Sequence, residues 1–232
     1  RRGFVEAAWH AKHRSAFGKL LADQPAMQNV LADLALESEA ATVAALRAAR
    51  AYDDGDHTFK RIATAVLKYW VCKRGPGHAA ESLECHGGNG YVEESLMPRL
   101  YRDAPLNSIW EGSGNVAALD VLRAFAKEPE GLPAFMAEVE LASGANEHLD
   151  AHVASLKQRI GGLGEGDPQW QARRVVEDMG LALQASLVLR HSPAFVSDAF
   201  CAARLGPERS TTYGTLPASI DAKAIIDRAL PL

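Results

Sequence analysis

Cysteine is scarce in this sequence, where only Cys72, Cys85 and Cys201 occur and no two of them have CxxC spacing. An odd number of widely spaced cysteines argues against a disulfide framework and indicates no thiolate metal site, so no metal is expected. Long apolar runs are also missing, since none approaches the roughly 18 residues that a membrane-spanning helix needs. The N-terminal residues lack the pattern of a signal peptide. We therefore expect a cytoplasmic protein with no membrane partner.

An excess of one sign of charge is missing as well. The 232 residues contain 25 Lys and Arg against 29 Asp and Glu, a formal net charge of -4 at pH 7. Such a balance does not indicate a nucleic-acid partner, which requires a basic surface. Apolar residues make up 47% of the chain, enough for a buried core. The first nine residues have no initiating Met and no capping residue, so we expect a piece of a longer protein.

Helical periodicity is what the sequence does contain. The opening residues recur at helical spacing to about Phe17, with Gly18 as the stop, and such a helix places Arg14 and Phe17 on one face. Pro25 suits the first turn of a second helix, whose apolar stripe continues toward Tyr52.

A third helix follows from Thr58, where apolar residues match the i, i+3, i+4, i+7 pattern at every step. The preceding residues 53–57 superficially resemble the start of a calcium loop, but the remaining oxygen ligands are missing, so a turn that caps the third helix is predicted. Gly75-Pro76-Gly77 predicts a kink or an interruption, after which the helix resumes over 79–85.

The sequence predicts a division into a helical bundle at 1–127 and a helical extension at 128–232, because Glu128-Pro129-Glu130-Gly131 breaks the chain. Ser113 or Asn115 should open the last helix of the bundle, which covers 116–126. The extension contains, in order, a segment at 132–160, a glycine-rich turn at 161–166, a helix start at Asp167-Pro168, and two shorter helices near 194–205 and 218–230. No alternating run long enough for a strand occurs, so the fold class is all-α.

The stretch from Glu84 to Asn115 holds five of the nineteen glycines and allows two interpretations at each motif. Gly87-Gly88-Asn89-Gly90 follows a helix, so it is either a C-terminal cap or bare backbone that approaches a phosphate or a flat ring. Glu111 either favours the start of the next helix through the helix dipole or acts as a general base on a loop. Arg14 and Phe17 either clamp a phosphate and a ring or lie on the surface.

Several motifs then occur together in a known order. They are Arg14-x-x-Phe17-Gly18, Lys68, Gly87-Gly88-Asn89-Gly90-Tyr91, Arg99-x-x-Arg102-Asp103 and Ile109-Trp110-Glu111-Gly112-Ser113. In order and approximate spacing, about the first 125 residues resemble the C-terminal helical domain of acyl-CoA dehydrogenases. Residues 84–91 and 107–115 look most like the AidB-like branch, the bacterial adaptive-response flavoproteins. That branch also carries a helical extension, which suits residues 130–232.

The resemblance implies an FAD-dependent oxidoreductase that dehydrogenates the α and β carbons of an acyl-CoA thioester. The family's glutamate at the position of Glu111 removes the α-proton while the flavin takes the β-hydride. Four positions match contacts with the adenosine diphosphate half of FAD, commonly the FAD of a neighbouring subunit: Arg14, Phe17, Gly87 and Gly88. Two more, Ser113 and Asn115, match positions beside the cofactor. The implied partners are an acyl-CoA-like substrate and further copies of the chain in a homo-oligomer, either a dimer or a tetramer.

Three positions depart from the family's pattern. The family often has Thr where Ala16 stands, Gln where Pro25 stands and Gln where Glu84 stands. Side-chain hydrogen bonds to the nucleotide are lost, and Glu84 puts a negative charge near a pyrophosphate. The family's N-terminal helical domain and middle β-barrel are not among these residues, so we expect a catalytic-base domain without most of its active site.

Two alternatives come from other functional classes. The AidB-like branch is linked to DNA protection, so a DNA-associated protein on a dehydrogenase scaffold is the second hypothesis. Residues 125–232 contain ten Lys and Arg and fourteen Asp and Glu, which does not favour DNA binding. A folded surface could still gather the arginines of this region into a patch, namely Arg173, Arg174, Arg190, Arg204 and Arg209. The third hypothesis is a structural oligomerisation module.

Overall fold

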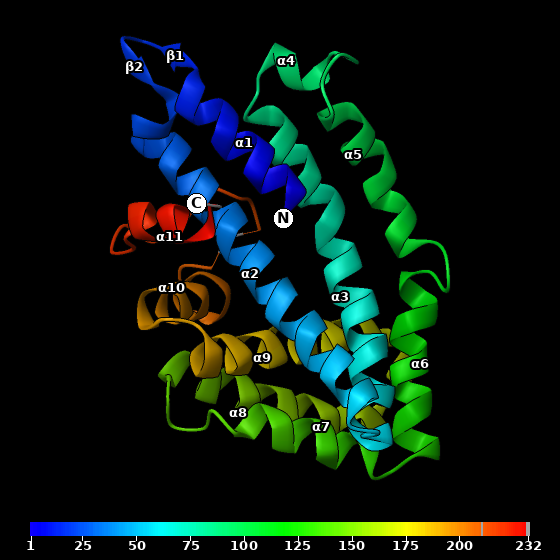
Figure 1. Ribbon diagram of the computed structural model, residues 1–232. Helices are drawn as coiled ribbons and strands as arrows, with labels where there is room; N and C mark the ends of the chain where they lie inside the picture. The colour runs from blue at the N-terminus through cyan, green and yellow to red at the C-terminus, as the bar shows by residue number, and fades with distance from the viewer. Residues whose placement is uncertain (210, 231–232) are drawn as a thin grey trace.

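Two long antiparallel helices, α2 (Pro25–Asp53) and α3 (His57–Glu84), form the centre of the molecule (Figure 1). The helix α1 (Arg2–His13) packs against both of them. The computed structural model describes residues 1–209 and 211–230. Within these residues no helix is both long enough and apolar enough to cross a membrane. The protein is all-α, as predicted, apart from one very short hairpin.

The remaining elements follow in two groups. Those of the bundle are β1 (Ser15–Ala16), β2 (Lys19–Leu20), η1 (Leu21–Asp23), α4 (Gly88–Tyr91), α5 (Met97–Asp103), η2 (Ala104–Ser108) and α6 (Gly114–Lys127). Those of the extension are α7 (Gly131–Glu140), α8 (Glu147–Gly161), η3 (Gly162–Glu165), η4 (Pro168–Gln171), α9 (Ala172–His191), α10 (Ala194–Leu205) and α11 (Ala222–Ala229). In Figure 1, α5 and α6 flank α3, α7 to α9 cross one end of the long helices, and α10 and α11 lie on the side of α2.

The start of α3 is fixed by the turn that the sequence predicts. The Asp56 side chain accepts a hydrogen bond from the Phe59 backbone N–H at 3.0 Å, which satisfies one of the free donors in the first turn. In the part of the chain that the structure describes, no three His, Cys, Asp or Glu side chains gather in an arrangement able to hold a metal ion. Residues 53–57 therefore serve as a cap and turn.

The first helix ends earlier than predicted, and the expectation that Arg14 and Phe17 share a helical face is wrong. α1 stops at His13, and β1 and β2 pair antiparallel with Ala16 opposite Lys19. Phe17 and Gly18 form the two-residue turn between them with φ values of 53° and 84°. Positive φ at both central residues gives the twist that a two-residue hairpin needs, so Gly18 serves this turn rather than a helix end.

Of the predicted kink or interruption of α3 at residues 75–77, the interruption is also wrong, and the kink stays a prediction. α3 continues through Pro76 to Glu84 as one helix. A proline inside a helix removes one hydrogen bond and costs about 3 kcal/mol, so packing on both sides has to outweigh that cost. Trp70 before the proline and Ala79 and Ser82 after it are all buried, which supplies that packing.

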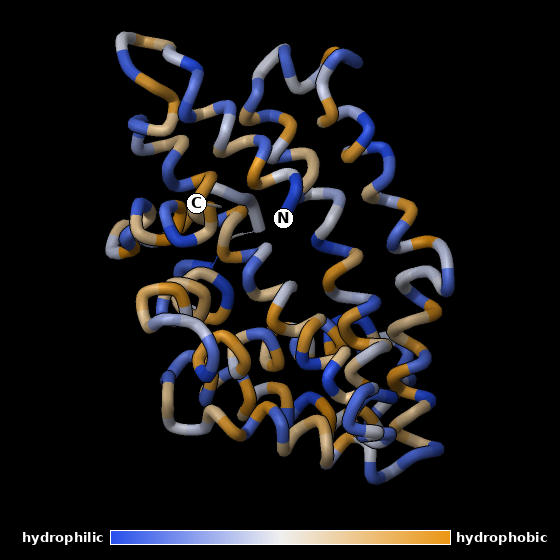
Figure 2. Tube along the Cα trace, viewed as in Figure 1, coloured by the Kyte–Doolittle hydropathy of each residue, from blue (hydrophilic) through white to orange (hydrophobic). Residues whose placement is uncertain are grey.

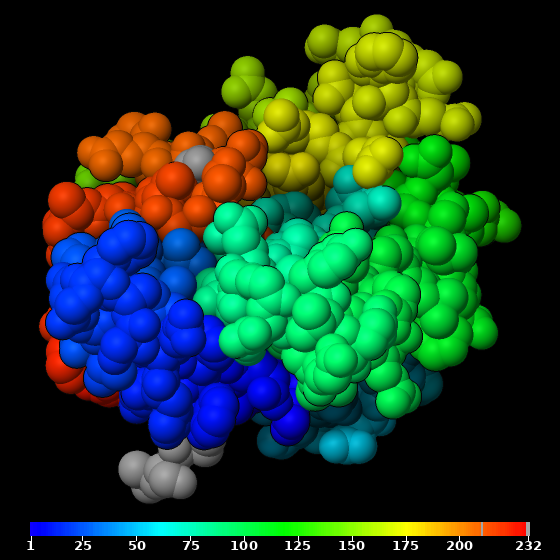
Figure 3. All heavy atoms as spheres, turned by 90° about the horizontal axis from the view of Figure 1, so that it is seen from above, coloured from blue at the N-terminus to red at the C-terminus, as the bar shows by residue number. Residues whose placement is uncertain are grey.

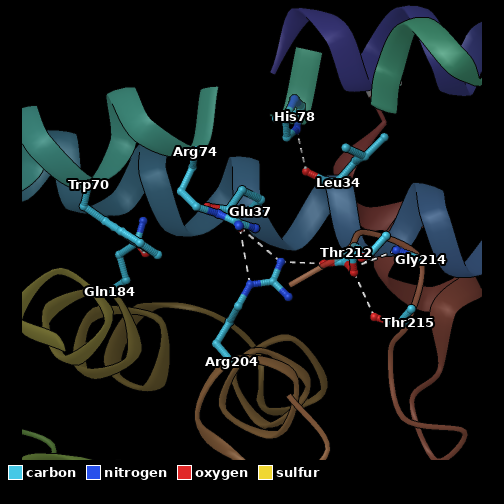
Figure 4. Close-up of polar contacts among 11 residues, drawn as sticks. Leu34, Glu37, Trp70, Arg74, His78, Gln184, Arg204, Thr212, Gly214 and Thr215 are labelled. Atoms are coloured by element: carbon cyan, nitrogen blue, oxygen red, sulfur yellow. Dashed lines mark hydrogen bonds and ion pairs between the residues drawn. The ribbon is translucent and has the colours of Figure 1, made fainter. Parts of the chain in front are cut away.

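The helix α9 is the buried centre of the extension and packs against α2, α3, α6, α7, α8 and α10. The Trp70 indole N–H donates to the Gln184 side-chain oxygen at 2.8 Å, which links α3 to α9 (Figure 4). Gly180 lies so close to Trp70 that an added Cβ would sit 2.7 Å from the indole ring. Hydrophobic positions occur along the helices of both groups (Figure 2), and one buried core includes residues from both. The division at residues 127 and 128 stays a prediction.

Candidate functional site

The loop between η2 and α6 presents Glu111 in an unusual backbone conformation. Glu111 has a φ of 53° and Gly112 a φ of 104°, so two consecutive residues occupy the left-handed region. A residue with a side chain seldom adopts this region without tertiary support. Here Lys68 of α3 supplies support, since its ammonium group donates to the carbonyl oxygen of Trp110 at 2.8 Å and also to that of Asn107.

The Glu111 side chain is exposed and lines an open groove of about 390 Å³ between α3 and α6. Its carboxylate forms no hydrogen bond and no ion pair with any residue in 1–209 or 211–230. Four positively charged side chains line the same groove, and so does Asp120, which pairs with two of them, Arg61 and Arg123; the other two are Lys60 and Lys68. A free carboxylate in such surroundings can accept a proton from a molecule that enters the groove.

The predicted neighbours of Glu111 do lie beside it, at the start of α6. Ser113 is the N-cap residue of α6, and Asn115 lies in the first turn of that helix. Both are exposed, and the Ser113 side chain makes no capping hydrogen bond. Gly114 between them is buried, and an added Cβ would lie 2.6 Å from Cε of Lys73. The structure thus brings Glu111, Ser113 and Asn115 together on one short exposed segment.

Gly87 and Gly88 lie at the other end of α3. Gly87 has a φ of 57° and ψ of -140°, a combination that only glycine adopts readily, and it ends the turn after α3. No atom lies within 4 Å of a Cβ added to either glycine, so their backbone faces open space. α3 itself ends at Glu84 with Cys85 as its C-cap, so the two glycines lie beyond the helix end, and both are exposed. Bare backbone at this place fits the predicted approach of a phosphate or a flat ring.

Arg14 and Phe17 lie at this same end of the molecule. The Phe17 ring is 97% exposed, and the Arg14 side chain has no hydrogen bond or ion pair within the described part of the chain. The rings of His10, one turn before Arg14, and His86, next to Gly87, lie 4.8 Å apart between centroids. Burial, and then the charges of His86 and Arg14, lower the pKa of His10. Figure 3 shows the blue N-terminal segment beside the green segment that follows α3.

The two groups of predicted residues are therefore separate within one copy of the chain. Glu84, which precedes the glycines, lies sixteen positions after Lys68, which holds the Glu111 loop, and both belong to α3. At the rise of an α-helix this corresponds to about 24 Å. One copy places Glu111, Ser113 and Asn115 at one end of this span and Arg14, Phe17, Gly87 and Gly88 at the other.

A larger groove, of about 910 Å³, borders Gly87 and was not predicted. It lies between the end of α3 and α5, and exposed Tyr91 and Tyr101 contribute apolar surface to it. Glu84 also lines it, so the carboxylate that departs from the family's pattern lies next to the bare glycine backbone. The Arg102 guanidinium in this groove binds the Glu93 carboxylate through two hydrogen bonds of 2.6 and 3.1 Å.

Three arginines of the extension, Arg174, Arg204 and Arg209, line one groove together with Arg74 and Glu177, whereas Arg173 and Arg190 do not line it. Arg204 binds the buried carboxylates of Asp33 and Glu37, and Arg190 binds Glu138 at 2.6 Å. Arg173 donates to the Tyr69 hydroxyl at 3.1 Å. The other two, Arg174 and Arg209, line two adjoining grooves that also contain Glu177 or Asp178. Carboxylates therefore pair with Arg174, Arg190 and Arg204, three of the five arginines on which the DNA hypothesis depends.

Comparisons with known proteins agree with the resemblance. The protein-family model for the acyl-CoA dehydrogenase C-terminal domain matches residues 1–126. The chain is 42% identical over 165 residues to the putative acyl-CoA dehydrogenase AidB of Escherichia coli, an alignment that covers 69% of this chain and 30% of AidB. The chain therefore spans less than a third of the length of that relative.

Two solved structures share the fold. One is Caenorhabditis elegans ACDH-11 in complex with C11-CoA, with a TM-score of 0.81 at 23% identity over 98% of this chain and 43% of that one. The other is a Bacillus anthracis acyl-CoA dehydrogenase complexed with FAD, with a TM-score of 0.65 at 17% identity over 98% of this chain and 45% of that one. Because these matches cover nearly the whole chain, they extend to the arrangement of the helices in the extension.

Proposed function

The chain belongs to the acyl-CoA dehydrogenase family, and on that premise we propose that it supplies the general base, Glu111, of an FAD-dependent α,β-dehydrogenation of an acyl-CoA thioester. One observation carries the proposal. Glu111 is an exposed carboxylate without a partner in the described residues, and it lines a groove from a tethered loop at the position that matches the family's base. A carboxylate that only stabilised a helix start would not need this left-handed, tethered loop.

In the proposed reaction a Glu111 carboxylate oxygen takes the proton from the α-carbon of the thioester. The C–H electron pair then forms the new double bond with the β-carbon, which loses a hydride. When bound, FAD supplies the acceptor for this hydride. Lys60 and Arg123 line the groove of Glu111 and favour a substrate that carries negative charge. These side chains, together with Glu111, are what this chain contributes to the chemistry.

The residues at the far end of α3 fit the adenosine diphosphate half of FAD. The unpaired Arg14 guanidinium suits a phosphate, the exposed Phe17 ring suits a flat base, and the open backbone at Gly87 and Gly88 permits a close approach. Ser113 and Asn115 suit a cofactor contact near Glu111. Glu84 opposes a pyrophosphate at this place, so FAD should bind this chain less tightly than it binds typical relatives.

A second copy of the chain is part of the proposal. Because about 24 Å of helix separates the two groups of residues, Arg14, Phe17, Gly87 and Gly88 serve the cofactor of a neighbouring subunit rather than that beside their own Glu111. A dimer or tetramer follows. A DNA-associated role stays a prediction that no contact in the structure favours.

The test is the reductive half-reaction of a flavin-loaded protein that contains this chain. Glu111→Gln keeps the size of the side chain and removes its ability to accept the proton. The proposal requires a large fall in the rate of flavin reduction by acyl-CoA thioesters, with FAD still bound. Reduction at the parental rate would remove Glu111 from the chemistry.

A further inference from the structure

Lys68 joins the two ends of the turn that precedes Glu111. Its Nζ atom donates to the carbonyl oxygen of Asn107, where the turn begins, and to that of Trp110 at 2.8 Å, where it ends. Lys68 lies in the middle of α3, and its neighbours Leu67 and Tyr69 are buried in the core. The turn is therefore attached to a long helix of the core through two charge-assisted hydrogen bonds.

Glu111 lies between this attachment and a second one. On its other side the start of α6 is fixed by Gly114, which is buried against the side chains of Lys73 and Tyr69. Only Glu111, Gly112 and Ser113 separate Trp110 from Gly114, and the first two of them have positive φ. A segment this short has few ways to join two fixed points, so the attachments select the left-handed conformation of Glu111.

We propose that Lys68 is the positioning residue for Glu111, which it holds through the backbone of the loop and not by touching the reacting atoms. The proposal rests on the proposed function, in which Glu111 takes the α-proton. A general base acts only when its oxygen lies within hydrogen-bond reach of that proton, and a misplacement of about 1 Å can cost about 100-fold in rate. Lys68 therefore affects the rate of the chemical step more than the affinity for substrate.

Another lysine of the same groove provides a comparison. Lys60 also lines the groove, but its ammonium group lies 4.7 Å from the centre of the Tyr52 ring and donates no hydrogen bond to the loop within the described residues. Lys60→Met removes the same charge as Lys68→Met and leaves the loop attached. Lys68→Arg keeps a cation that can donate to both carbonyl oxygens.

The first experiment measures the attachment on the 232-residue chain and does not depend on any activity. Amide hydrogen exchange is followed at Ile109 and Trp110, whose N–H groups donate to the Leu106 carbonyl oxygen inside the turn. Lys68→Met removes both charge-assisted hydrogen bonds and should speed exchange at both amides at least about tenfold, the effect expected from the loss of one such bond. Lys60→Met should leave these amides unchanged. Less than about a twofold effect of Lys68→Met would overturn the proposal.

The second experiment measures flavin reduction by an acyl-CoA thioester in a flavin-loaded protein that contains this chain. Lys68→Met should lower the rate constant at saturating substrate by about 10- to 100-fold, with less than about a threefold change in substrate affinity. Lys68→Arg should restore most of the rate. Faster amide exchange with an unchanged rate would overturn the positioning role. A parental rate in Glu111→Gln would instead overturn the proposed function, while the exchange result still reports on the attachment.

Discussion

Arg204 of α10 binds Asp33 of α2, since its guanidinium donates a hydrogen bond to the Asp33 carboxylate at 2.5 Å. The same guanidinium donates to Glu37 at 3.1 Å, and Arg74 of α3 binds Glu37 from the other side at 2.9 Å (Figure 4). Burial by itself raises the pKa of the Glu37 carboxyl, but Arg204 and Arg74 outweigh that effect and hold it below its ordinary value. This buried cluster fixes the extension to the bundle.

Removal of Arg204 should therefore destabilise the whole protein. Its side chain is only 9% exposed, and Arg204→Met leaves the buried Glu37 carboxylate with Arg74 alone and the buried Asp33 carboxylate with no ion-pair partner among the described residues. Breaking a buried ion pair in this way costs about 3–5 kcal/mol of unfolding free energy. The matched control is Arg228→Met, which breaks a half-exposed pair with Glu39 and should cost no more than about 1 kcal/mol. Urea unfolding measures the unfolding free energy of both variants. Equal losses in the two would contradict the claim that the buried cluster fixes the extension to the bundle.

A partly buried histidine should make the fold sensitive to mild acid. The Nε2 atom of His78 donates to the Leu34 carbonyl oxygen at 3.1 Å, and burial lowers the pKa of His78 below its ordinary value of 6.5. Above that value the imidazole is neutral in both the folded and the unfolded chain. Below it the unfolded chain binds the proton first, so the unfolding free energy falls as the pH falls.

The check on this prediction is His78→Gln, which can still donate to Leu34 but does not titrate. Urea unfolding between about pH 7.5 and pH 5.5 should show a smaller loss of stability in the variant than in the parent. Some loss should remain, because His10 also has a lowered pKa. Glu37 contributes at lower pH, since its stabilisation is present above about pH 4.5 and is lost as the pH falls through its lowered pKa. If the unfolding free energy fell equally with pH in the parent and in His78→Gln, His78 would be ruled out as a source of the acid sensitivity.

The helices could be predicted because each carries its own periodic signal. α10 spans Ala194–Leu205, as predicted, and the cap at Asp56 was predicted from the turn before α3. The failures at Phe17 and Pro76 have a different origin. A phenylalanine with positive φ has no local signal, and packing far from Pro76 in the sequence maintains α3 through a residue that normally breaks a helix.

The candidate site likewise contains residues that the sequence groups together and contacts that the sequence does not indicate. Glu111, Ser113 and Asn115 could be grouped from the sequence because they are close neighbours in it. The bond from Lys68 to Trp110 joins residues 42 positions apart, and no pattern in the sequence indicates it. The Arg204 bond to Asp33 spans 171 positions, so the pairing of this arginine with buried carboxylates could be seen only in the folded chain.

The far end of α3 gives a prediction about cofactor affinity. In a flavin-loaded protein that contains this chain, Arg14→Gln removes the free guanidinium that we assign to a phosphate of FAD. The loss of one charge-assisted hydrogen bond should weaken FAD binding by about 10- to 100-fold. Lys19→Gln, an exposed cation of the same hairpin, is the control and should have little effect. Flavin fluorescence during titration of the apoprotein measures both, and equal affinities in parent and Arg14→Gln would contradict the assignment.

The most direct test of Glu111 as the general base is stopped-flow bleaching of the flavin in Glu111→Gln, with a range of acyl-CoA thioesters. The proposal predicts a fall of about 10²- to 10⁴-fold in the rate of flavin reduction, with FAD content unchanged. Glu130→Gln, at the start of α7, changes another exposed glutamate and should reduce at the parental rate. If Glu111 only stabilised the start of α6, the Gln variant would lose about 0.3–1 kcal/mol of stability and keep its rate. Flavin reduction in Glu111→Gln at near the parental rate would contradict the account.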